Sequence, residues 1–214
     1  FKTKIFITIN NYDFNYAKLI LAKKKPCYKI NGVGLSLSLN HFKKKISKKK
    51  EINKILVIAA YKIDKGYLEI LKIAEILNKK NIKIECFGYG SYGIFKSIKI
   101  KKKLNNINFN NFDINLRNKI KNFDILLHLS KREGLPVDVM QSLSEGLPVI
   151  CYNIRGNSDL IMDKINGYFV NSFHDVPKKI NYLNLENDIY NEMRLNAFKS
   201  IKKDFLKKNI NLSL

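Results

Sequence analysis

From residue 54 onward, short apolar runs alternate with segments of helical periodicity, and this alternation is the feature that most constrains the fold. The apolar run Lys54 to Ala60, for example, precedes Tyr67 to Lys80, whose leucines fall on one helical stripe. Strands that alternate with helices form βαβ units, which build a parallel sheet covered by helices on both faces. The sequence therefore predicts an α/β fold with a Rossmann-like, doubly wound parallel sheet of about six strands. The expected strands are Lys54–Ala60, Ile82–Phe87, Ile107–Phe109, Phe123–Leu129, Val149–Tyr152 and Gly167–Val170.

The N-terminal part of the chain shows a smaller pattern of strand, helix and strand. Three segments form it: Lys4–Ile9, Tyr12–Ala22 and Cys27–Ile30. We expect residues 1–34 to be a remnant of a second domain, residues 35–53, which are polar and basic, to be a linker, and residues 54–214 to be the main domain. The first residue is Phe1 rather than Met, which suggests that the chain is a fragment.

The chain is strongly basic, because 40 Lys and Arg residues outnumber 18 Asp and Glu residues and give a formal net charge of +22. Such an excess favours attraction to nucleic acid, anionic lipid or phosphorylated ligands. The alternative is compositional bias, since the lysines are spread over many expected helix faces and no nucleic-acid recognition motif accompanies them. We favour bias and predict no nucleic-acid partner. Peripheral contact with an anionic membrane follows from either interpretation.

The cysteines and the apolar runs indicate a cellular setting. Cys27, Cys86 and Cys151 form no C-x-x-C pair, so zinc and redox motifs are not expected. We interpret Cys86 and Cys151 as small core residues in a reducing, cytosolic environment. No apolar run approaches the ~20 residues of a membrane span, and the first residues lack the apolar core of a signal peptide. We therefore predict a cytoplasmic protein.

A ligand site is expected in residues 130–149, S-K-R-E-G-L-P-V-D-V-M-Q-S-L-S-E-G-L-P-V. Glu133 and Gly134 lie in the turn after an expected strand, and Pro136 is expected at the first position of the next helix, where proline is well tolerated. Open α/β sheets bind ligands in such turns, at the carboxyl ends of their strands. Glycine lets the backbone approach a ligand closely, and the start of a helix offers free N–H groups to an anion. Lys65, at the start of another helix, adds a positive charge, so the corner predicts a phosphate or diphosphate.

Other kinds of chemistry have less support in the sequence. None of the three histidines has a nucleophile in a suitable context, and no spacing of His, Cys, Asp and Glu indicates a metal site. His128, at the end of an apolar strand, is open to two interpretations: a satisfied core histidine, or a side chain that lines the site.

Several segments carry a resemblance to a known family. The most specific is E-G-L-P-V-D-V-M-Q-S-L-S-E-G-L-P-V, which starts at Glu133; I-A-A-Y-K-I-D-K-G-Y, C-F-G-Y-G, I-N-G-V-G and N-G-Y-F-V accompany it. From about Ile5 to Val170 the chain thereby resembles the glycosyltransferase family 4 type. These are retaining sugar transferases with two Rossmann-like domains (the GT-B architecture). The resemblance is nearest to enzymes of capsule, exopolysaccharide or lipopolysaccharide biosynthesis.

The resemblance implies a division of labour between two domains. The C-terminal domain would bind a nucleotide-diphosphate sugar, here a UDP- or GDP-sugar with no further cofactor, and the N-terminal domain would bind the acceptor. Lys65 would contact the diphosphate, and Glu133, the first glutamate of an E-x7-E motif, would hold hydroxyls of the donor sugar; both are the implied catalytic residues. The implied donor-binding residues are Gly66, Gly88, Tyr89, Gly90, Asn111, Ser130, Gly134, Leu135, Pro136, Val137 and Gln141.

The chain departs from the family pattern at several positions. Gln141 stands where the second glutamate would accept hydrogen bonds from the nucleotide ribose, and a neutral amide loses a charge-assisted bond of roughly 1–2 kcal/mol. Ala60 stands where the family has arginine, and Lys62 offers a substitute charge. Leu129 and Asn111 replace a frequent proline and a frequent glycine.

The predicted function is that of the donor-binding half of a hexosyltransferase-type glycosyltransferase. It would transfer a sugar, with retention, from a nucleotide-diphosphate sugar to a polysaccharide or lipid-linked acceptor. The alternative is a truncated or split-chain nucleotide-sugar-binding module with no activity of its own, which the lack of most of an acceptor domain, Gln141 and Ala60 favour. A separate acceptor-domain chain is an expected partner.

Overall fold

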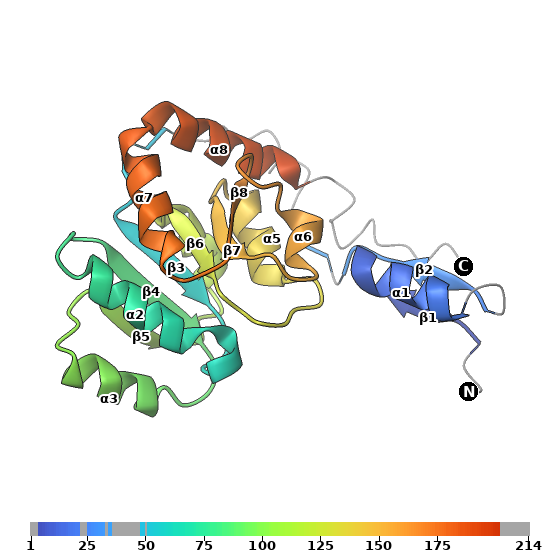
Figure 1. Ribbon diagram of the computed structural model, residues 1–214, viewed down its shortest axis with the longest axis horizontal. Coiled ribbons are helices and arrows are strands. Elements are labelled where there is room, and N and C mark those ends of the chain that lie inside the picture. The colour runs from blue at the N-terminus through green and yellow to red at the C-terminus, as the bar shows by residue number, and fades with distance from the viewer. Residues whose placement is uncertain (1–3, 22–24, 33, 36–47, 50, 202–214) are drawn as a thin grey trace.

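A computed structural model describes residues 4–21, 25–32, 34–35, 48–49 and 51–201 (Figure 1). Its main feature is a six-stranded parallel sheet with the strand order β5-β4-β3-β6-β7-β8. The strands are β3 (Lys54–Ile58), β4 (Lys83–Gly88), β5 (Ile107–Asn111), β6 (Ile125–His128), β7 (Val149–Tyr152) and β8 (Gly167–Val170). The predicted α/β fold with about six parallel strands is confirmed.

Helices cover both faces of this sheet. They are α2 (Tyr67–Leu77), α3 (Gly93–Lys101), α4 (Leu116–Lys119), α5 (Val137–Ser144), α6 (Asn157–Leu160), α7 (Asp175–Leu185) and α8 (Asn187–Ser200). Successive side chains of a strand point to opposite faces. In β3, Ile55 and Val57 accordingly belong to one core with α2 and α7, whereas Leu56 belongs to a second core with α5. The sheet is therefore doubly wound, as predicted.

The strand order reverses between β3 and β6. From β3 the chain proceeds outward through β4 to β5, then returns to β6 on the other side of β3 and continues to β7 and β8. The loops that follow β3 and β6 are therefore neighbours at the carboxyl edge of the sheet. This switch point is where open α/β sheets bind their ligands.

The N-terminal unit consists of β1 (Phe6–Thr8), α1 (Asn11–Leu21) and β2 (Cys27–Lys29), and its two strands pair in parallel. In Figure 1 it lies beside the main sheet, near α6. An ion pair of 2.8 Å joins Arg155 to Asp13, and the Asp159 carboxylate accepts a hydrogen bond from the backbone N–H of Asn11. Residues 36–47 and 50 of the expected linker lie outside the described residues, so the domain boundaries stay a prediction.

Some element boundaries differ from those predicted. Pro136 is not the first helical residue: its backbone is extended (φ −73°, ψ 119°), and its carbonyl accepts the first helical bond from Met140, so it is the N-cap of α5. A 3-10 turn, η3 (Ile120–Asn122), directly follows α4. Among the described residues, no helix is both long and apolar enough to cross a membrane.

Candidate functional site

The two residues predicted to be catalytic meet at the switch point. Lys65 ends the 3-10 turn η2 (Ile63–Lys65) after β3, and Glu133 lies in the loop after β6. The Nζ atom of Lys65 is 2.6 Å from Oε1 of Glu133, and both side chains are partly buried. The two loops are also joined through the backbone, because the N–H of Lys131 donates to the carbonyl of Asp64 at 2.9 Å. The structure thus brings a cation and a carboxylate together where a ligand is expected.

Two of the predicted glycines are required by close backbone approaches. Gly66 has a φ of +82°, and a Cβ atom there would lie 2.5 Å from the carbonyl oxygen of Leu129. At Gly88 a Cβ atom would lie 1.9 Å from the carbonyl oxygen of Ala59. Only glycine fits such positions without movement of the backbone. Gly66 in particular keeps the Lys65 loop in contact with the end of β6.

Gly134 lies where the main domain meets the N-terminal unit. Its carbonyl accepts a hydrogen bond of 3.1 Å from the Asn10 side chain, and a Cβ atom at residue 134 would lie 2.8 Å from Cδ1 of Ile9. On another side, a Cβ atom at Gly156 would lie 2.1 Å from the carbonyl oxygen of Gly134. The candidate site is therefore bordered by the N-terminal unit, close to its Glu133 carboxylate.

The start of α5 presents unsatisfied backbone donors beside this loop. Pro136 caps the helix without any side-chain hydrogen bond. The first N–H groups of an α-helix have no intrahelical partner and favour an anion. Leu135 and Pro136 themselves are buried, and Val137 is half-buried. This helix start supplies donors of the kind that bind phosphate.

His128 is held between two carboxylates at the end of β6. Its Nδ1 lies 2.8 Å from Oδ2 of Asp138, and its Nε2 lies 3.6 Å from Oε1 of Glu133. Burial lowers the pKa of His128, but the charge and hydrogen bond of Asp138, with the charge of Glu133, raise it more than Lys65 lowers it. The net result is a His128 pKa above its ordinary value. His128 therefore belongs to the candidate site, in agreement with one of the two interpretations of the sequence.

Tyr89 and its neighbours lie at the same edge, at the ends of β4 and β5. Gly88 pairs with Asn111 in the register of these strands. The ring of Tyr89 stacks on that of Phe112, with centroids 4.1 Å apart and planes inclined by 15°. Tyr89 is 63% exposed and Phe112 is 43% exposed, so the pair presents an aromatic surface to solvent. Gly90, which adopts a φ of +98°, ends this turn.

The remaining residues predicted to bind the donor are Ser130 and Gln141. Ser130 is buried, with 1% of its surface exposed. Gln141 is half-buried in α5, and its backbone carbonyl accepts a hydrogen bond from Ser144 Oγ at 2.7 Å. Lys62, which offers a substitute charge for the arginine of the family, is exposed.

The sequence reasoning missed three residues of this region: Asp138, Gly156 and Phe112. Asp138 had a usable signal, since it lies in the first turn of the helix that follows Glu133. The other two become visible only when separate loops are brought together.

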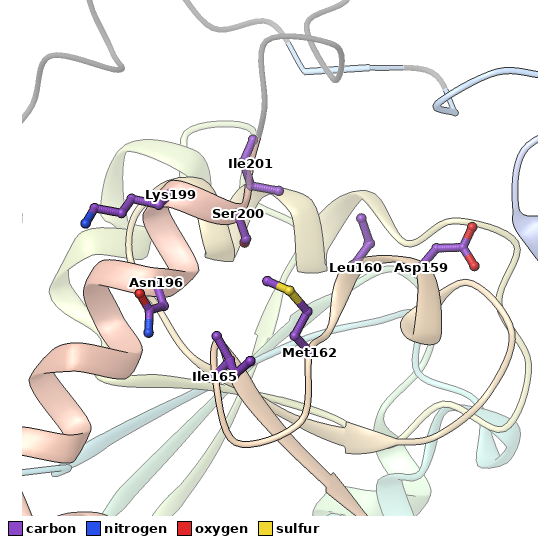
Figure 2. A pocket seen from close by; sticks show the side chains of 8 residues that line it. All are labelled: Asp159, Leu160, Met162, Ile165, Asn196, Lys199, Ser200 and Ile201. Atoms are coloured by element: carbon purple, nitrogen blue, oxygen red, sulfur yellow. The ribbon is translucent and has the colours of Figure 1, made fainter.

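Within the described ranges, no cluster of three or more His, Cys, Asp and Glu side chains could hold a metal ion. A pocket of about 410 Å³ lies between the end of α8 and the segment from α6 to β8 (Figure 2). It shares no residue with the predicted site. Its lining consists of Asp159, Leu160, Met162, Ile165, Asn196, Lys199, Ser200 and Ile201.

The strand order defines a Rossmann-like domain with a candidate ligand site at its switch point. A comparison with protein families identifies it further. The model of the family "Glycosyl transferases group 1" matches residues 40–200, so the chain belongs to this family.

Curated relatives match shorter segments. The chain is 29% identical over 92 residues to an Escherichia coli UDP-Gal:alpha-D-GlcNAc-diphosphoundecaprenol alpha-1,3-galactosyltransferase. It is 31% identical over 83 residues to a trehalose synthase of Thermococcus litoralis. These matches cover 43% and 39% of this chain, but only 23% and 20% of the relatives.

Solved structures share the fold over nearly the whole chain. The pneumococcal O-GlcNAc transferase GtfA, in complex with UDP and GlcNAc, has a TM-score of 0.82 at 19% identity, over 98% of this chain and 43% of its own. TarM of S. aureus has a TM-score of 0.79 at 19% identity, over 95% of this chain and 41% of its own. The chain therefore has the Rossmann-like fold of GT-B glycosyltransferases and spans less than half the length of these proteins. The family resemblance in the sequence is confirmed for group 1, while retention stays a prediction.

Proposed function

We propose that this chain binds a nucleotide-diphosphate sugar and forms the donor-binding half of a glycosyltransferase. The observation that carries the proposal is the Lys65–Glu133 pair at the switch point, beside the start of α5, whose N-cap makes no side-chain hydrogen bond. An ammonium group and free helix N–H groups suit a diphosphate, and a carboxylate suits the hydroxyls of a sugar. Both types of group would then contact one ligand.

Each residue of the corner has a role in this proposal. Lys65 binds the diphosphate and stabilises the charge that develops on it as the sugar leaves. Glu133 accepts hydrogen bonds from sugar hydroxyls. The backbone of Gly66 and of residues 134–137 approaches the sugar and the phosphates. Because Lys65 and Glu133 hold each other in the free chain, both exchange that contact for donor contacts on binding.

The nucleoside would lie toward β4 and β5. Tyr89 offers an aromatic face for a base, with Gly88, Gly90 and Asn111 beside it. Ser130 and Gln141 complete the donor site, and Gln141 faces the ribose with an amide where a carboxylate would bind more strongly. The donor is a UDP- or GDP-sugar, and the reaction needs no additional cofactor.

The reaction proposed is a sugar transfer with retention. The bond between the anomeric carbon and the diphosphate oxygen breaks, a bond to an acceptor oxygen forms, and the acceptor hydroxyl loses its proton. Positioning of the two substrates and stabilisation of the leaving diphosphate carry the catalysis. The name of the E. coli relative supports a lipid-linked acceptor, and a polysaccharide is the other candidate.

Binding of the acceptor would require more polypeptide than the residues that the structure describes. The N-terminal unit touches Gly134 and so places its edge beside the donor corner. A separate acceptor-domain chain is one source of the missing part, and a solved neighbour is a complex of GtfA and GtfB. The net charge of +22 supports peripheral contact with an anionic membrane from the cytoplasmic side.

A second candidate is a nucleotide-sugar-binding module without activity of its own. The departures from the family pattern at Gln141 and Ala60 favour it. Calorimetry with UDP and GDP tests the donor site: binding of either is expected, and no heat at millimolar nucleotide contradicts both candidates. Turnover of a radiolabelled UDP-sugar by this chain alone would then exclude the inactive module.

A further inference from the structure

His128 carries an unmet hydrogen-bonding group inside the site. The side chain is 4% exposed, and its Nδ1 is hydrogen-bonded to Asp138 at 2.8 Å. Its Nε2 is buried without a hydrogen-bond partner. The nearby acceptor is Oε1 of Glu133, whose distance of 3.6 Å is too long for a hydrogen bond. Buried polar atoms are rarely left unpaired, so this arrangement requires a reason.

The reason lies in competition for one oxygen atom. Oε1 of Glu133 is already paired with Nζ of Lys65 at 2.6 Å. If a diphosphate draws this ammonium group away, Glu133 loses its counter-charge while its side chain is only 18% exposed. A carboxylate in such a position needs another partner. His128 is the group placed to provide it.

The surroundings of His128 favour a proton on both ring nitrogens. The titratable groups that face it are Asp138 from α5, Glu133 from the following loop, Lys65 from η2 and Cys151 from β7. Asp138 and Glu133 outweigh burial and Lys65, so the pKa of His128 is raised. Burial raises the pKa of the Cys151 thiol, which therefore stays neutral. A protonated imidazole donates from Nδ1 and from Nε2.

We propose that His128, oriented by Asp138, is a positioning residue that donates a hydrogen bond to Glu133 when Lys65 leaves Glu133 to bind the donor diphosphate. This inference rests on the proposed function. In the free chain, Lys65 holds Glu133. In the donor complex, Nε2 of His128 donates to Oε1 of Glu133, so the carboxylate stays oriented while its other oxygen accepts a sugar hydroxyl. Asp138 keeps the ring in the orientation that this exchange requires.

The direct test is a histidine NMR titration of the whole chain with and without UDP. The His128 signals are assigned with the variants His128→Gln and His174→Gln. UDP is expected to raise the pKa of His128 by about one unit, because Lys65 is neutralised and Glu133 is released. The exposed His174 should not respond.

The variant Glu133→Gln separates this exchange from a direct effect of the diphosphate charge. Most of the UDP-induced rise in the pKa of His128 should disappear in Glu133→Gln, because the charged acceptor is gone. A rise of the same size in that variant, or an unmoved His128 in wild-type protein that binds UDP, would overturn the inference alone. Failure of wild-type protein to bind UDP would overturn the proposed function as well.

A binding profile against pH adds a readout that a purely structural residue would not move. The affinity for UDP-glucose should decline as the pH rises through the pKa of His128. Asp138→Asn should shift this decline to lower pH, and His128→Gln should lower the affinity about tenfold and remove the pH dependence. Unaltered profiles in both variants contradict the inference, and His174→Gln serves as the control.

Discussion

The Nζ atom of Lys65 lies 2.6 Å from Oε1 of Glu133, although 68 positions separate the two residues in the sequence. The contact exists because β3 and β6 are paired neighbours at the point where the strand order reverses. A partly exposed ion pair contributes at most about 1 kcal/mol to stability. Its importance therefore lies in the groups that it holds ready for a ligand.

The contact between the two loops depends on Gly66. In Gly66→Ala, a positive φ and a Cβ atom 2.5 Å from the Leu129 carbonyl are expected to lower the free energy of unfolding by about 2 kcal/mol or more. A loss of this size lowers the melting temperature by roughly 4–8 °C. Gly93→Ala is the matched control, since its nearest contact is an ordinary 3.6 Å to Ser91. Equal melting temperatures for the two variants would contradict this description of the corner.

Gln141 is predicted to limit nucleotide affinity. Gln141→Glu restores a charged acceptor for the ribose hydroxyls and should tighten UDP binding about tenfold, or roughly 1–2 kcal/mol. Gln141→Met, which removes the acceptor, should weaken it. Isothermal titration calorimetry of wild type, Gln141→Glu and Gln141→Met with UDP tests this prediction. If the glutamate variant binds UDP no better than wild type, residue 141 does not face the ribose.

Tyr89 is predicted to stack on the base. Tyr89→Ala should weaken UDP binding by about 1 kcal/mol, or roughly fivefold, without a change in melting temperature, because the side chain is 63% exposed. Binding of inorganic pyrophosphate should not change, since it has no base. Tyr182→Ala, at another exposed tyrosine, is the control. A parallel loss of pyrophosphate affinity would place Tyr89 at the phosphates instead.

The His128–Asp138 pair predicts a pH-dependent contribution to stability. A histidine whose pKa is raised by folding stabilises the protein fully below its unfolded pKa of about 6.5, and this stabilisation is lost as the pH rises through the folded pKa. The loss of unfolding free energy in Asp138→Asn should therefore be larger at pH 6 than at pH 9. Urea denaturation at both pH values measures it, with His174→Gln as the control. The same loss at both values would show that His128 is uncharged in the fold.

Periodicity and turn residues were sufficient to predict the sheet and the Lys65–Glu133 corner. The alternation from residue 54 onward predicted six parallel strands, and residues at the carboxyl ends of neighbouring strands must meet at one edge. The pairing of Lys65 with Glu133 follows from that rule once β3 and β6 are adjacent.

The contact between His128 and Asp138 could not be predicted in the same way. Ten residues separate them across the end of a strand, a loop and the start of a helix, so no period relates them. Whether they meet depends on the direction in which α5 leaves the loop. That direction is set by the extended backbone of Pro136, which the sequence indicated as helical. The Tyr89–Phe112 stack is equally a product of two separate loops.

The central claim, that the Lys65 corner binds the diphosphate of a nucleotide, is tested most directly by calorimetric titration of wild type and Lys65→Ala with UDP. Wild-type protein should bind UDP, and loss of a charge-assisted contact should weaken binding at least about tenfold in Lys65→Ala. Lys96→Ala, which removes an exposed lysine of α3, should leave the affinity unchanged. Equal UDP affinity in wild type and Lys65→Ala, or no binding by either, would contradict the account.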